Sequence, residues 1–219
     1  PLEILAREST DIAGPVLAGP NFAREIAAGL PAASVIAAAD MAHGRTLADL
    51  LATPLFRFYA SSDTTGVQLG GAAKNVIALA AGITMGAGLG ENARAALITR
   101  GLAEITRLAL ALGGQAATLA GLAGLGDLLL TCTGHASRNY QMGLALGQGA
   151  ATREALAGLP GVAEGVTTAA ALLALARKHE VDAPITECIT AFLEGRLSLP
   201  QAQTQLLSRP LKGELDTES

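Results

Sequence analysis

The spacing of apolar residues changes near residue 61. Before it, short apolar runs at residues 15–18, 33–37 and 55–59 alternate with turn residues, which is the pattern of short strands. The segments between them, residues 21–28 and 43–52, have the spacing of short helices. This part of the chain therefore predicts an α/β segment. About three strands are too few for a doubly wound sheet to be stable by itself.

From Ser61 onward the apolar residues recur at helical intervals, and Ser62 or Asp63 can cap a long helix. Residues 92–112 give the clearest helix, which ends at Gly113. The side of this helix that faces the core is predicted to consist of Ala95, Ala96, Ile98, Leu102, Ile105 and Leu108. More helices are predicted at residues 122–131, 137–146, 164–178 and 185–193, and a last one that opens at Ser198 with a capping box to Gln201. The polar tail at residues 212–219 is expected to fray.

These elements predict a mainly α fold with two parts. Residues 1–62 form a small α/β segment with about three strands and two short helices. Residues 63–219 form an all-helical domain. Composition supports the helical part, because 50% of the residues are hydrophobic and only 3% are aromatic, so that the apolar content is mostly Ala, Leu, Val and Ile. The 26 glycines indicate sharp turns or close approaches between backbones.

Charge and cysteine content exclude several classes of function. The formal net charge is −4, and no basic stripe is interleaved with aromatic residues, so nucleic-acid binding has little support. The two cysteines and three histidines have the spacing of neither a disulfide framework nor a metal site. We interpret Cys132 and Cys188 as reduced thiols of a cytoplasmic protein.

Mean hydropathy is positive, at +0.41, which raises the question of a membrane span. The most apolar run, residues 76–90, is interrupted by glycines and is shorter than the roughly 20 residues that a spanning helix needs. Charged residues follow Pro1 closely, which does not fit a signal peptide. We therefore expect no membrane span.

The glycines at residues 86–90 suggest a loop that binds phosphate, but the spacing is G-x-G-x-G and the preceding segment reads as a helix. A dinucleotide-binding turn needs G-x-G-x-x-G directly after a strand, with an acidic residue further on. We interpret this segment as a structural turn between two helices. No other segment has the dinucleotide spacing.

Three further groups of residues could carry chemistry. Lys74 lies within small apolar residues on a buried helix, where burial favours the neutral amine that can accept a proton; a lysine that reaches solvent is the structural alternative. Asp127 is flanked by glycine and leucines, and Ser137 and Arg138 open a helix as a phosphate site would; an ordinary helix cap with a solvated arginine is the alternative. Glu164, at another helix start, is by itself most simply a favourable charge at the helix dipole.

Six segments, taken together and in order, resemble the bacterial NAD(P)-dependent glycerol-3-phosphate dehydrogenase family. They are GPNFA at residues 19–23, GGAAKNV at 70–76, NARAALITRGL at 92–102, GLGDLLLTC at 124–132, SRN at 137–139 and EGV at 164–166. The resemblance extends from about residue 16 to about residue 207. It implies hydride exchange between a nicotinamide (NAD or NADP) and C2 of glycerol 3-phosphate, with dihydroxyacetone phosphate as the other partner, feeding glycerophospholipid synthesis.

The resemblance also implies roles for individual residues. Lys74 matches the family's proton-transfer lysine. Substrate contacts are implied at Gly19, Asn21, Lys74, Asn75, Asp127, Thr131, Ser137, Arg138 and Asn139. Cofactor contacts are implied at Ala23, Arg138, Val162 and Glu164.

The chain also departs from the family pattern. Asn21 stands where the family has a hydroxyl residue, and Ala73 and Ala163 replace larger apolar residues. The family's G-x-G-x-x-G turn and a second substrate lysine would precede Pro1, so residues 1–62 correspond to a remnant of a Rossmann-type dinucleotide-binding domain. The 219-residue chain alone is expected to turn over little or nothing, and a homodimer is expected by analogy with the family.

The sequence also allows two other interpretations of the function. The chain could be part of a related two-domain dehydrogenase for another hydroxy acid, although the Ser137–Arg138 pair favours a phosphorylated substrate. It could also be a non-catalytic helical dimerisation module, in which Lys74 would have no chemical role.

Overall fold

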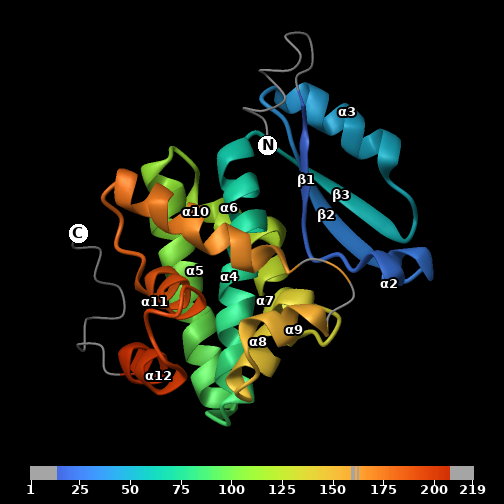
Figure 1. Cartoon of the computed structure of the whole chain (residues 1–219). Coiled ribbons are helices and arrows are strands. Elements are labelled where there is room, and N and C mark those ends of the chain that lie inside the picture. The colour runs from blue at the N-terminus through green and yellow to red at the C-terminus, as the bar shows by residue number, and fades with distance from the viewer. Residues whose placement is uncertain (1–13, 159–160, 162, 208–219) are drawn as a thin grey trace.

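The computed structural model describes residues 14–158, 161 and 163–207. A small sheet with its short helices lies to one side of a larger helical body (Figure 1). The expected fraying of residues 212–219 and the role of Val162 fall outside the described residues. The mainly α fold with a small preceding sheet is confirmed, whereas the domain boundary after residue 62 stays a prediction.

The sheet has three strands in the order β1 (Val16–Ala18), β2 (Ala32–Ala37) and β3 (Phe56–Ser61). β1 runs antiparallel to β2, and β2 runs parallel to β3. The parallel pair is joined by α3 (Met41–Leu51), which Asp40 caps by accepting from the backbone N–H groups of Ala42 and His43. α2 (Ala23–Ala27) connects β1 to β2. All three strands and both short helices lie where the alternating pattern predicted them.

α4 (Thr64–Gly86) is the central helix of the molecule (Figure 1). It begins after Asp63, one of the two predicted caps, whose carboxylate accepts from the N–H of Gly66 at 2.7 Å. The same carboxylate also accepts from the N–H of Gln115 at 2.8 Å. Other helices surround α4 and bury it on most sides, which explains why its sequence is apolar all round instead of amphipathic.

The remaining helices pack around α4 or against one another. They are α5 (Gly90–Ala111), α6 (Ala116–Leu119), α7 (Asp127–Thr133), α8 (Arg138–Gly147), α9 (Thr152–Ala157), α10 (Glu164–Lys178), α11 (Pro184–Leu193) and α12 (Leu199–Leu207). The single helix expected at residues 122–131 is wrong, because this segment is a π-helical turn, η1 (Leu122–Gly126), that leads directly into α7. A pattern of leucines does not distinguish these two kinds of turn.

Two expectations about α5 and its connection have different outcomes. The turn at residues 86–90 is confirmed as the link between α4 and α5, with Gly88 at φ +73° and Gly90 at φ +86°. The predicted core face is partly wrong, because Ala95 and Ala96 are exposed. The buried side consists of Ile98, Gly101, Glu104, Ile105, Leu108 and Ala109.

Two helical stretches, Thr64–Gly86 and Ala116–Thr133, are long and apolar enough to cross a membrane, judged by length and composition alone. α4 reaches this length because it begins well before the apolar run at residues 76–90 and contains 23 residues. However, 72% of the most apolar window of α4 is buried inside the structure, as in the core helix of a helical domain. The absence of a membrane span stays a prediction.

The sheet rests on the helical part through a small apolar cluster. Ala37 of β2, Val67 of α4 and Ala123 of η1 are buried together, and Val16, Ala18 and Val35 pack against them. This contact brings the loop after β1 close to η1 and α7, where the polar residues of the next section gather.

Candidate functional site

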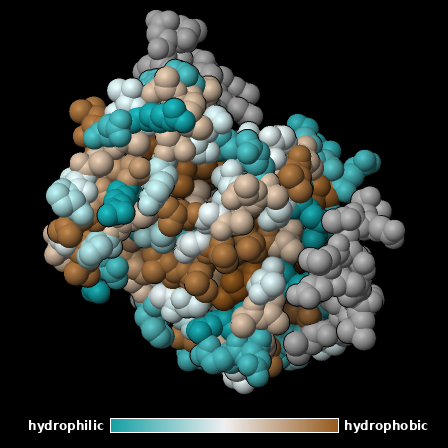
Figure 2. Space-filling model, turned by 180° about the vertical axis from the view of Figure 1, so that it is seen from behind, coloured by the Kyte–Doolittle hydropathy of each residue, from teal (hydrophilic) through white to brown (hydrophobic). Residues whose placement is uncertain are grey.

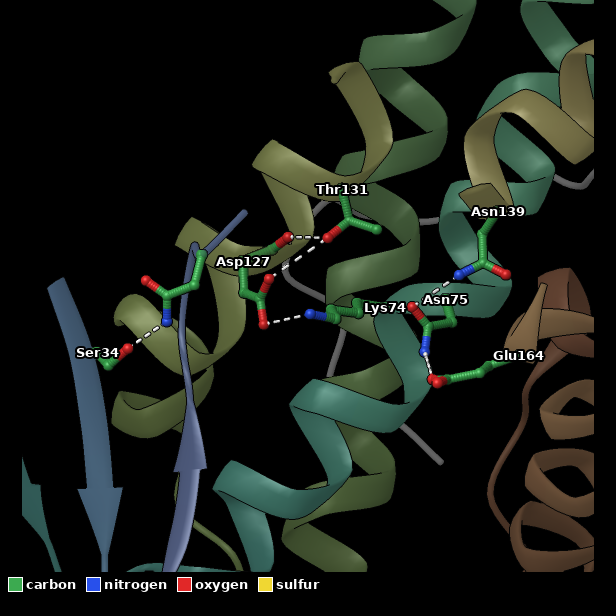
Figure 3. Close-up of polar contacts among 8 residues, drawn as sticks. Ser34, Lys74, Asn75, Asp127, Thr131, Asn139 and Glu164 are labelled. Carbon is green, nitrogen blue, oxygen red and sulfur yellow. Dashed lines mark hydrogen bonds and ion pairs between the residues drawn. The ribbon is translucent and has the colours of Figure 1, made fainter. Parts of the chain in front are cut away.

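Lys74 and Asp127 form an ion pair at the centre of the polar residues (Figure 3). The Nζ of Lys74 lies 2.5 Å from Oδ2 of Asp127. The lysine side chain is 21% exposed and the aspartate side chain is 4% exposed, so the pair lies at the edge of the interior. The structure therefore combines both interpretations of Lys74, since its side chain is mostly buried and paired with Asp127 but is still 21% exposed.

Asp127 is held by further contacts. Thr131 lies one turn later in α7, and its hydroxyl is 2.6 Å from the backbone oxygen of Asp127 and 3.4 Å from Oδ1. The backbone N–H of Gly19, in the loop after β1, also donates to the carboxylate. Burial raises the pKa of Asp127, while the charge of Lys74 and these hydrogen bonds oppose that rise. The pKa of the Asp127 carboxyl group is therefore set by opposing effects, which is common at functional sites.

A second polar group lies on the next face of α4 (Figure 3). The amide nitrogen of Asn75 donates to Oε2 of Glu164 at 3.2 Å, and its oxygen accepts from Nδ2 of Asn139 at 2.9 Å. The oxygen of Asn139 accepts from the N–H of Gly165 at 2.8 Å. These bonds connect α4, α8 and the start of α10. Asn75 thus lies in a group separate from Lys74, Asp127 and Thr131.

Ser137 is the N-cap of α8, and its buried hydroxyl accepts from the N–H of Tyr140 at 3.3 Å. Arg138 is exposed, and its guanidinium lies beside Gly161, which has φ +100°. Ser137 and Arg138, which are predicted to bind phosphate, therefore lie at the first turn of α8 together with Asn139. Val162, the expected cofactor contact next to Gly161, lies outside the described residues.

The loop after β1 approaches the same region. Asn21 donates through Nδ2 to the hydroxyl of Ser34, which is fully buried in β2. The Oδ1 of Asn21 is buried and has no hydrogen-bond partner in the described part of the chain. Ala23 is exposed at the start of α2. The pattern of the sequence did not reveal Ser34, because a serine within a strand has no distinguishing spacing.

The chain is similar to known proteins over most of its length. Residues 63–204 match a family model described as the C-terminus of NAD-dependent glycerol-3-phosphate dehydrogenase. The chain belongs to this family. A relative from Gluconobacter oxydans named glycerol-3-phosphate dehydrogenase [NAD(P)+] is 60% identical over 210 residues, which is 96% of this chain and 65% of the relative. One of the same name from Cereibacter sphaeroides is 51% identical over 98% of this chain and 68% of the relative.

A solved structure shows the same fold. The crystal structure of glycerol-3-phosphate dehydrogenase from Coxiella burnetii matches with a TM-score of 0.91 and 43% identity, over 95% of this chain and 64% of that one. The chain thus spans about two thirds of the length of these family members. The resemblance read from six short segments is confirmed.

Proposed function

We propose that the chain supplies the substrate site and the proton-transfer lysine of an NAD(P)-dependent sn-glycerol-3-phosphate dehydrogenase, which interconverts glycerol 3-phosphate and dihydroxyacetone phosphate. The observation that carries the proposal is the accessible ion pair of Lys74 with Asp127, close to the loop after β1. The helix start that bears Arg138 adds an exposed cation for the phosphate. Family membership supplies the reaction class.

Lys74 is the proposed proton-transfer group. In the oxidation of glycerol 3-phosphate, its amine takes the proton of the C2 hydroxyl, and in the reduction of dihydroxyacetone phosphate it returns that proton to the carbonyl oxygen. The bound nicotinamide supplies or accepts the hydride at C2. Asp127 stabilises the protonated lysine and fixes its position, while Thr131 orients Asp127.

The phosphate is proposed to bind at the first turn of α8. Arg138 supplies a guanidinium, and Ser137 and Asn139 supply polar groups beside the free N–H groups of the helix start. Asn21, in the loop between β1 and α2, is proposed as a further substrate contact from the family pattern. Gly19 is proposed as a neighbouring substrate contact because its N–H donates to the Asp127 carboxylate. Asn75 is proposed as another because it follows Lys74 in α4.

The described residues can provide only part of a binding site for the nicotinamide cofactor. Arg138 beside Gly161 suits an anionic dinucleotide, and Glu164 offers a carboxylate at the start of α10. Ala23 and Val162 are proposed as further contacts from the family pattern. The described residues contain no G-x-G-x-x-G turn between a strand and a helix. They therefore do not indicate whether the cofactor is NAD or NADP.

A fusion enzyme tests the function directly. The chain is joined behind the N-terminal third of the Gluconobacter oxydans relative, and oxidation of NADH and NADPH is followed with dihydroxyacetone phosphate. We expect turnover that is lost when an unphosphorylated hydroxy ketone replaces the substrate. Equal turnover of both ketones would favour another hydroxy-acid dehydrogenase, and a correctly folded fusion without turnover would contradict the proposal.

Substitution of Lys74 separates catalysis from a purely structural role. Lys74→Ala in the fusion is expected to lower kcat by at least 10²-fold, because it removes the proton-transfer group. Lys178→Ala is the matched control, since Lys178 is exposed in the last turn of α10, and it should leave kcat unchanged. Unchanged turnover in Lys74→Ala would instead support a non-catalytic helical module.

We also propose that the chain forms a homodimer in a cytoplasmic enzyme. Apolar residues gather near the middle of the back face of the molecule (Figure 2). Leu125 and Leu129, on consecutive turns of η1 and α7, are 41% and 50% exposed. Sedimentation equilibrium tests the proposal, and a monomer at micromolar concentration would contradict it.

A further inference from the structure

Gly70 lies in α4 one turn before Lys74, on the same face of the helix. This position touches the backbone of η1. A Cβ at residue 70 would lie 2.6 Å from the carbonyl oxygen of Ala123, which is closer than real Cβ atoms approach other atoms. Any side chain at residue 70 would therefore push η1 away from α4.

η1 connects this contact to the site without an intervening loop. Its five residues, Leu122–Gly126, run directly into Asp127, the first residue of α7. π-helical turns are rare, and they are frequently found at functional sites. The turn is tightly packed, because a Cβ at Gly124 would lie 2.1 Å from the carbonyl oxygen of Leu119. The position of Asp127 thus follows from where η1 rests on α4.

We propose that Gly70 is a positioning residue, which lets the Ala123 carbonyl rest against α4 and so sets the separation at which Asp127 meets Lys74. The inference rests on the proposed function, in which Lys74 transfers the proton. Aspartate has a short side chain, so the 2.5 Å contact with Lys74 depends on the distance between the two helices. Displacement of a catalytic group by about 1 Å commonly costs on the order of 10²-fold in rate.

The neighbouring glycine provides a matched control. Gly71 is in the same helix, but a Cβ there would meet only the Cβ of Ala18 at 3.7 Å, an ordinary contact. Gly70→Ala and Gly71→Ala gain the same helix propensity, and only the former meets the backbone of η1. A difference between the two variants therefore reports the contact with Ala123.

The first measurement is an NMR titration of the Asp127 carboxyl in the 219-residue chain. The groups that face Asp127 are Lys74 of α4, the N–H of Gly19 in the loop after β1, and Thr131 and the thiol of Cys132 in α7. Burial already raises the pKa of Asp127, and Lys74 opposes that rise. We expect a higher pKa of Asp127 in Gly70→Ala, because the lysine is further away, and no change in Gly71→Ala.

The second measurement is steady-state kinetics in the fusion enzyme. Gly70→Ala is expected to lower kcat by 10-fold to 100-fold. The KM for dihydroxyacetone phosphate should change less than threefold, because the phosphate residues belong to α8. Gly71→Ala should stay within twofold of the parent in both quantities.

The outcomes separate the two proposals. An inactive parent fusion would contradict the proposed function, while the titration would still decide the role of Gly70. Equal behaviour of the two variants in the titration would overturn the inference.

If Gly70→Ala does not fold although Gly71→Ala does, the contact with Ala123 supports the fold as a whole. The inference that Gly70 serves to position Asp127 would then be overturned.

Discussion

At the scale of single residues, buried polar side chains connect elements that are far apart in the sequence. Glu104 is 3% exposed in the middle of α5. Its carboxylate accepts from the N–H groups of Ile185 and Thr186 at 2.9 and 3.0 Å, and from the Thr186 hydroxyl at 2.5 Å. A side chain of α5 thus caps the start of α11, where the free N–H groups of a helix favour a carboxylate.

Glu104→Gln should destabilise the chain by about 2–3 kcal/mol at pH 7, because the amide NH₂ would face backbone donors. Burial raises the pKa of Glu104, whereas Thr186, Ile185 and the charge of Arg107 oppose the rise. With the folded pKa above the unfolded value of about 4.3, the wild type binds a proton more tightly when folded. Its stability relative to Glu104→Gln is therefore greatest in acid, and it falls as pH rises through the folded pKa.

Urea unfolding of both proteins between pH 4 and 8 measures this dependence. Glu91→Gln is the control, because Glu91 is in the same helix but 66% exposed, and it should change stability little. A difference between wild type and Glu104→Gln that does not vary with pH would contradict the prediction.

At the scale of elements, α4 and α8 approach so closely that glycines face the partner backbone. A Cβ at Gly143 of α8 would lie 2.1 Å from the carbonyl oxygen of Leu79. A Cβ at Gly82 of α4 would lie 2.2 Å from the carbonyl oxygen of Tyr140. This close packing fixes the helix start that carries Ser137, Arg138 and Asn139 against the helix that carries Lys74.

Gly143→Ala is therefore expected to lower the free energy of unfolding by about 3 kcal/mol or more, since the backbones must separate. Gly44→Ala is the control, because a Cβ in α3 would meet its neighbours no closer than 3.6 Å. The control should gain up to about 1 kcal/mol from helix propensity. Thermal unfolding compares the two, and a tolerated Gly143→Ala would show that the helix pair can relax.

At the scale of the whole molecule, the site exists only where the sheet segment meets the helical part. The N–H of Gly19 reaches Asp127 from the loop after β1, and the Phe22 ring lies against Gly134 at the end of α7. These contacts join residues that precede α4 to residues that follow α5. The ion pair is therefore completed by both parts of the chain.

Hydrogen exchange tests this junction. Asp127→Ala removes the acceptor of the Gly19 N–H, so that amide should exchange at least tenfold faster. The amide of Ala38 is the control, because it bonds to the carbonyl oxygen of Ser61 at 3.0 Å within the sheet segment. Equal acceleration at both amides would indicate general loosening of the sheet instead of loss of one contact.

Most of the elements, and the family, could be predicted from the amino-acid sequence. Strand and helix positions followed from local apolar spacing, because the periods of the two structures differ and each is written into neighbouring residues. A cap of α4 at Ser62 or Asp63 and the glycine turn before α5 could also be predicted, since caps and turns depend on a few adjacent residues. The six family segments identified the chain because their order is a property of the sequence alone.

The grouping of the polar residues could not be predicted from the sequence and is seen in the folded structure. It placed Asn75 with Asn139 and Glu164, and Lys74 with Asp127 and Thr131, although Lys74 and Asn75 are neighbours in sequence. It also revealed the π-helical turn and the buried role of Glu104, and it showed Ala95 and Ala96 to be exposed. These features depend on which backbones approach one another closely. That approach is set by packing between distant segments, and local spacing does not encode it.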